Sequence, residues 1–212
     1  MTLKNTKGMR KVAVAAASAA ALVGFAVPAS AHEPLVLDKC DILPQTGPLI
    51  PTGTDPMGIM GTLPQLGADR SFQLTMNAGD ELSIGYGIPD LAPENTLATS
   101  SLPVALIIAP DGTPTLLQPN MRVPLYNDDF DQNYLFLNQY STTAKAGTYS
   151  VVLIGRAPER VFVATGVEDS GFHGIERGSL ATDAQVDAWY STLPTDPQPA
   201  CDGNGSMFAA KG

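Results

Sequence analysis

Apolar residues recur at every second position through much of residues 71–165, and this alternation limits the fold more than any other feature of the chain. In the segment Ser71–Asn77 the alternate residues Phe72, Leu74 and Met76 fall on one face. A period of two is the pattern of a half-buried β-strand. Similar runs, separated by turn residues about every eight to twelve positions, predict roughly seven or eight short strands. The sequence therefore predicts a mainly β protein, a single antiparallel β-sandwich of jelly-roll or immunoglobulin-like type.

Two turns in this region predict β-hairpins. Asn77–Asp80 reads "NAGD" between two alternating runs, and Ala157–Glu159 reads "APE" between two others. Gly, Asp and Pro are the residues that tight turns favour. The continuously apolar run Leu102–Pro110 instead predicts a strand that is covered on both faces.

The segments on either side of the predicted sandwich have a different character. Residues 41–67 are crowded with Pro and Gly, which neither a helix nor a central strand tolerates well. We therefore predict an irregular N-terminal arm at 32–69 and the β-sandwich at 70–180. Thr182 with Gln185 makes a capping-box pattern, which predicts one short helix within a C-terminal region at 181–212.

Residues 1–31 have the pattern of a bacterial secretory signal peptide. Four Lys and Arg residues precede an Ala-rich apolar run, and "ASA" ends at Ala31. Small residues at these positions mark a cleavage site. We expect cleavage after Ala31, no membrane insertion of the mature chain, and a secreted or extracytoplasmic location in the cell envelope.

The net charge limits the classes of partner that the protein can bind, and the two cysteines bear on a disulfide in the expected compartment. The chain has 21 acidic and 12 basic residues, a net charge of −9, and loss of the four basic residues of the signal gives 8 − 21 = −13. Such a balance argues against nucleic acid, because binding to phosphates needs Lys and Arg clusters. In an oxidising compartment the two cysteines, Cys40 and Cys201, are expected to pair. That disulfide would clamp the C-terminal tail to the body of the protein.

Three motifs in chain order resemble a known family. They are "FQLTMNAGDELSIGYGI", "LPVALIIAPDGT" and "AKAGTYSVVLIG". Across residues 70–165 this order is similar to the bacterial prepeptidase C-terminal type of β-sandwich module. The resemblance implies a β-sandwich fold and a noncatalytic binding role, but no particular ligand.

The two histidines of the chain, His32 and His173, are candidate copper ligands. After cleavage, His32 would carry a free α-amine beside its imidazole, and nitrogen ligands of this kind suit copper. The pattern resembles the histidine brace of lytic polysaccharide monooxygenases and of CopC-type copper carriers, which implies a carrier or an oxidative enzyme. Asp169 is near His173 in sequence, but its spacing departs from the CopC-type pattern. Met57, Met60, Met76 and Met121 could serve Cu(I), although methionines commonly fill gaps in a core.

An acidic loop offers a second candidate metal site. Asp128, Asp129 and Asp131 lie in "YNDDFDQNY", and carboxylate oxygens are the ligands that Ca²⁺ takes. A solvated acidic turn explains the same residues. No G-x-S-x-G motif accompanies His173, so we expect a noncatalytic binding or envelope protein whose partner is a protein or glycan at the cell surface. Copper binding is the alternative.

Overall fold

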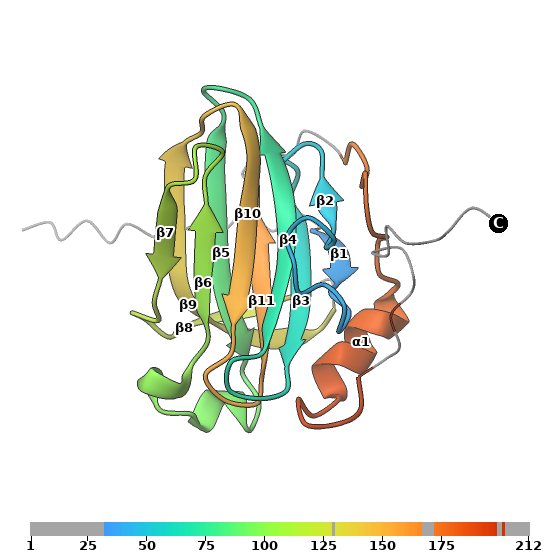
Figure 1. The fold of residues 1–212 in the computed structure, drawn as a ribbon. Helices are drawn as coiled ribbons and strands as arrows, with labels where there is room; N and C mark the ends of the chain where they lie inside the picture. Colours follow the sequence, from blue (N-terminus) through green and yellow to red (C-terminus); the bar gives the residue numbers. More distant parts are fainter. Residues whose placement is uncertain (1–31, 129, 167–171, 199–200, 202–212) are drawn as a thin grey trace, which may run out of the picture.

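The structure, a computed structural model, describes residues 32–128, 130–166, 172–198 and 201. These residues form two β-sheets packed face to face with one α-helix at their side (Figure 1). The predicted mainly β sandwich with a short C-terminal helix is confirmed. The predicted signal at 1–31 lies outside the described residues, and no helix among those that are described is long and apolar enough to cross a membrane.

The larger sheet has six strands in the order β1-β3-β11-β5-β9-β8. Their bounds are β1 Glu33–Val36, β3 Met57–Leu63, β11 Glu159–Thr165, β5 Glu81–Pro89, β9 Gln132–Thr143 and β8 Val123–Asn127. All neighbours in this sheet are antiparallel except β1 and β3, which run parallel.

The smaller sheet has five strands in the order β2-β4-β10-β6-β7. Their bounds are β2 Leu49–Ile50, β4 Asp69–Met76, β10 Gly147–Ile154, β6 Val104–Ile108 and β7 Pro114–Leu117. Here β2 runs parallel to β4, and the other pairs are antiparallel. Two short 3₁₀ helices, Glu94–Thr96 and Thr99–Ser101, lie between β5 and β6.

The alternation in the sequence places the hydrophobic core between the two sheets. Phe72, Leu74 and Met76 of β4 are buried together with Leu82 and Ile84 of β5. Each face that was predicted to be apolar is thus the inner face of its sheet. Burial of these side chains away from water is the main force that holds the two layers together.

Neither of the two predicted hairpins forms. The turn Asn77–Asp80 joins β4 of the smaller sheet to β5 of the larger one, and Gly155–Pro158 likewise joins β10 to β11. Both connections are arches from sheet to sheet. The prediction was wrong because alternation fixes which face of a strand is buried, whereas the same turn residues suit a hairpin and an arch equally.

The prediction of an irregular arm at 32–69 was also wrong. β1, β2 and β3 all lie in this segment, and β3 is an internal strand between β1 and β11. Gly58 and Gly61 are tolerated within β3 because the strand is held by hydrogen bonding on both edges and packs against Leu37 and Arg70 at Gly61. The prolines of this segment lie in the connections between strands, such as Pro51 and Pro56, or in the edge strand β1.

The helix α1, Asp183–Ser191, is confirmed where the capping-box pattern predicted it. The backbone N–H of Gln185 donates to the Thr182 hydroxyl at 3.4 Å, and the Thr182 N–H donates to the Gln185 side chain at 2.9 Å. Val186 and Trp189 are buried against the outer face of the larger sheet. The helix therefore covers β1 and β3 at one side of the sandwich (Figure 1).

Candidate functional site

A cleft of ≈ 220 Å³ lies between β1 and α1. Its apolar lining consists of Val36, Leu37, Leu180, Ala181, Ala188 and Trp189. Its polar lining consists of Asp38, Thr62, Ser179, Gln185, Thr192 and Gln198. The cleft thus combines apolar side chains with hydroxyl, amide and carboxyl groups, and none of its lining side chains is basic.

The helix α1, which forms one wall of the cleft, is held in place by hydrogen bonds as well as by packing. The Trp189 indole N–H donates to the Gly61 carbonyl of β3 at 3.1 Å. The hydroxyl of Tyr190, the next residue, donates to the Asn133 carbonyl of β9 at 2.8 Å. Because these two bonds reach different strands of the same sheet, α1 is held in a defined position across it. The sequence predicted the helix but not the cleft that it forms.

His173 is paired with a carboxylate that sequence reasoning missed. Its backbone N–H donates to Asp55 Oδ2 at 2.8 Å, and its ring Nδ1 lies 2.8 Å from Asp55 Oδ1. Asp55 is fully buried in the connection that precedes β3, whereas the His173 side chain is 51% exposed. A buried carboxylate therefore fixes the orientation of a histidine ring whose side chain is half exposed. No sequence signal links residues 118 positions apart.

The second histidine lies at the same end of β3. The N–H of Glu33, the next residue after His32, donates to the Pro56 carbonyl at 3.1 Å. The His32 Cβ lies 3.6 Å from where a Cβ on Gly58 would be. Parallel pairing of β1 with β3 thus places His32 next to the start of β3. No contact joins its side chain to that of His173 among the contacts described, so copper binding by the two histidines stays a prediction. Asp169 lies outside the described residues.

The predicted Cu(I) methionines are mostly internal. Met57 and Met76 lie in the core between the sheets, and Met60 packs against α1. These three side chains are buried, and Met121 is half-buried. Their positions fit the core-filling alternative, because a thioether enclosed by hydrocarbon is not accessible to an incoming ion.

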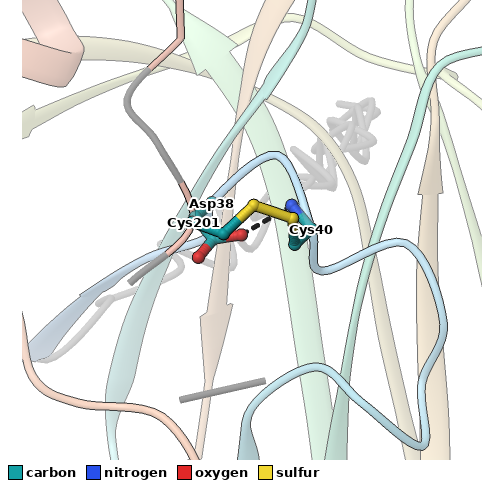
Figure 2. Close-up of side chains that lie close together, drawn as sticks. All are labelled: Asp38, Cys40 and Cys201. Atoms are coloured by element: carbon teal, nitrogen blue, oxygen red, sulfur yellow. Dashed lines mark hydrogen bonds between the residues drawn. A yellow bond between two sulfur atoms is a disulfide. The ribbon is translucent and has the colours of Figure 1, made fainter. Parts of the chain in front are cut away.

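The Cys40–Cys201 disulfide is present, as predicted, with Cα atoms 5.8 Å apart. Asp38 lies beside it, and its Oδ1 accepts the Cys40 N–H at 2.6 Å (Figure 2). Within the described ranges this trio is the one group of three or more Cys, His, Asp or Glu ligand atoms within 4.8 Å of one another. Because both sulfurs are bonded to each other, they are not thiolate ligands. The bridge anchors the tail next to the cleft, which Asp38 and Gln198 both line.

The acidic loop connects β8 to β9. Asp131 has a φ of 51° and accepts a hydrogen bond from the Tyr126 hydroxyl at 2.8 Å. This bond raises the pKa of Tyr126, because ionisation would place two negative charges together. Asp128 is exposed, and Asp129 lies outside the described residues. Calcium binding at Asp128, Asp129 and Asp131 stays a prediction.

A network of buried charge lies at the far end of β11, which sequence reasoning also missed. Arg160 and Glu94 form a two-pronged ion pair, with Nε to Oε1 at 2.6 Å and Nη2 to Oε2 at 2.8 Å. Arg160 Nη1 also donates to the Tyr190 carbonyl at the end of α1. The neighbouring Glu159 is fully buried, and desolvation raises its pKa to about 8.

Comparisons with known proteins found a likeness among solved structures alone. No family model matches the sequence, and no curated protein matches it. Among solved structures, the chain is similar to a carbohydrate-binding module from Cellvibrio mixtus lichenase 5A in complex with cellotriose, at 10% identity and a TM-score of 0.29. That match covers 49% of this chain and 73% of the module.

Proposed function

We propose that the protein is an extracytoplasmic, noncatalytic binding protein whose ligand site is the cleft between β1 and α1. The observation that carries this proposal is the mixed lining of the cleft, in which apolar side chains stand together with hydroxyl, amide and carboxyl groups. Ligand sites are usually concave and largely apolar, with a few polar groups that fix orientation.

The size of the cleft points to one small unit of a larger ligand. Its ≈ 220 Å³ is below the roughly 300–1,000 Å³ of sites that enclose a drug-sized molecule. A single ring or side chain fits this space, with the remainder of the ligand outside. A polymer at the cell surface presents such units repeatedly.

The chemistry of the lining favours a neutral sugar ring as that unit. A sugar ring has hydroxyl groups around its edge and apolar C–H faces. Gln185, Gln198 and Thr62 can exchange hydrogen bonds with hydroxyls, and Trp189 and Leu180 supply apolar contacts. An acidic ligand is disfavoured because Asp38 lines the cleft and the chain has a net charge of −9. The proposed partner is therefore a neutral glycan.

Trp189 makes the proposal testable, because it is the one tryptophan of the chain. We expect neutral oligosaccharides to change its fluorescence in a saturable way. The variant Ala188→Phe fills the cleft and should weaken binding at least about tenfold. The matched control is Ala184→Phe, which changes the same residue type on the exposed part of the same helix and does not line the cleft.

The competing ligand class is a protein segment, represented by short neutral and basic peptides in the same titration. Saturation by peptides but not by oligosaccharides would show that the partner is a protein and not a glycan. Equal affinity of Ala188→Phe and the parent protein would show that the ligand does not bind in the cleft. Circular dichroism of both variants shows whether α1 is retained.

A further inference from the structure

We propose that the Cys40–Cys201 disulfide is a positioning element of the ligand site, which completes the cleft by holding Gln198 against it. The inference rests on the proposed function of the cleft. Its basis is that each half-cystine closely follows a residue of the cleft lining, Asp38 before Cys40 and Gln198 before Cys201. One covalent bond therefore joins two segments of the chain that both line the cleft.

The tail that follows α1, residues 193–198, is hydrogen-bonded mainly to itself. The Asp196 N–H donates to the Leu193 carbonyl at 3.0 Å, and the Leu193 N–H donates to Asp196 Oδ2 at 3.2 Å. The Gln198 amide donates to the Asp196 carbonyl at 3.1 Å. Among the described residues, no hydrogen bond joins this tail to a strand or to α1. Packing of the buried Pro194 at its start and the disulfide beyond its end therefore hold the tail in place.

The Cys40 half of the bridge is fixed to the sandwich. Asp38 Oδ1 accepts the Cys40 N–H at 2.6 Å (Figure 2), and Asp41 Oδ2 accepts the Asp38 N–H at 2.8 Å. The Asp41 carbonyl accepts the Ser71 N–H of β4 at 2.6 Å. Because Cys40 lies in a turn that is bonded to the smaller sheet, the disulfide gives Cys201 and the tail a defined position beside the cleft.

A tail held in this way presents its polar groups to the ligand at a set place. One N–H of the Gln198 amide is bonded to the Asp196 carbonyl, which orients the group. Its other N–H and its oxygen can exchange hydrogen bonds with the hydroxyls of a sugar ring. A site that is ordered before the ligand arrives loses less conformational entropy on binding. The disulfide should therefore raise the affinity without contacting the ligand.

The alternative is a disulfide that acts on the fold alone. The bridge joins residues 161 positions apart, and closing so long a loop restricts the unfolded chain. This role predicts lower stability without the bridge but an unchanged cleft in molecules that stay folded. The two roles therefore differ in the exposure of Trp189, which lines the cleft and is 6% exposed.

The first test is the double variant Cys40→Ser with Cys201→Ser, which removes the bridge and leaves no unpaired thiol. Acrylamide quenching of Trp189 fluorescence is compared with that of the parent protein, under conditions in which circular dichroism shows both to be folded. We expect the quenching constant to rise about twofold, because a tail that is not tied down no longer lines the cleft. The affinity for neutral oligosaccharides should fall about tenfold, because the site is no longer ordered in advance.

Gln198→Ala tests the contribution of the tail while the bridge stays in place. It removes the amide alone, so the stability should be unchanged and the oligosaccharide affinity should fall about two- to tenfold. The matched control is Gln118→Ala, which removes the same group from an exposed position between β7 and β8 that does not line the cleft. It should leave the affinity unchanged. This pair of variants carries the test if the double serine variant does not fold.

Unchanged quenching and affinity in the folded double serine variant would overturn the inference, and so would parental affinity in Gln198→Ala. Failure of the proposed function gives a different result. In that case the parent protein binds no oligosaccharide, while loss of the bridge still raises the quenching of Trp189. Such a result would reject the glycan as the ligand and support the closure of the cleft by the tail.

Discussion

The pair of strands β3 and β11 has a buried carboxylate near each end. The two ends differ in how exposed the side chain bonded to that carboxylate is. At one end, Asp55 is bonded to His173, whose side chain is 51% exposed. At the other end, Glu94 is bonded to Arg160, and the side chains of both are enclosed, at 0% and 2% exposed. Thr165 of β11 lies near the first pair, and Arg160 near the start of the strand belongs to the second.

This difference indicates separate roles for the two ends. An ion pair enclosed on both sides can contact nothing outside the protein, so its effect is on the fold and on the position of α1 through Tyr190. An enclosed carboxylate with an exposed partner holds a side chain that solvent and ions can reach. Variants at the two ends should therefore lower the stability of the fold by different amounts.

The largest effect is expected for Arg160→Ala. It leaves Glu94 buried without its partner, and breaking a buried pair in this way costs about 3–5 kcal/mol. It also removes the bond to Tyr190, so Trp189 should become more exposed. Urea unfolding and the Trp189 emission maximum measure the two effects.

The double variant Arg160→Met with Glu94→Gln is the control for this prediction. It removes both charges and keeps similar volumes, so it should recover part of the lost stability. A cost below about 1 kcal/mol for Arg160→Ala alone would contradict the structural role assigned to this end.

The next effect is a pH dependence caused by Glu159. Burial raises its pKa from the ordinary value of 4.5 to about 8 in the folded protein. Between these values the folded state binds the proton more strongly than the unfolded state. Stability should therefore fall as the pH rises from about 4.5 to about 8, with a slope of at most about 1.4 kcal/mol per pH unit.

Glu159→Gln removes this titration, while the side-chain amide oxygen of the glutamine can still accept a hydrogen bond from the Arg156 N–H. Urea midpoints across this pH range should be flatter for the variant than for the parent protein. Parallel curves for the two proteins would show that Glu159 does not titrate there.

The smallest effect on stability is expected at the histidine end. Asp55→Ala leaves the His173 N–H without its acceptor, which costs about 1–3 kcal/mol. His173→Ala should cost less, because half of that side chain is already exposed and its backbone N–H keeps the bond to Asp55. Urea unfolding of the two variants tests this order, and a reversed order would assign the His173 ring the main structural role.

The residues that sequence reasoning placed correctly are those with local signals. The apolar alternation of β4 and β5 identified the buried faces, and Thr182 with Gln185 identified the start of α1. The Cys40–Cys201 pair followed from there being two cysteines and an expected oxidising compartment. The strand β3 was missed because Gly58 and Gly61 weaken a local strand pattern, which its neighbours β1 and β11 restore.

The sequence by itself determined that alternate side chains must be buried in two layers and that a capped helix follows them, since these depend on neighbours within a few residues. Only the tertiary structure decided that the turns are arches, that α1 forms a cleft with β1, and that Asp55 meets His173. Those contacts join residues far apart in the chain. Their partners are selected by how whole strands pair and pack, which no short stretch of sequence specifies.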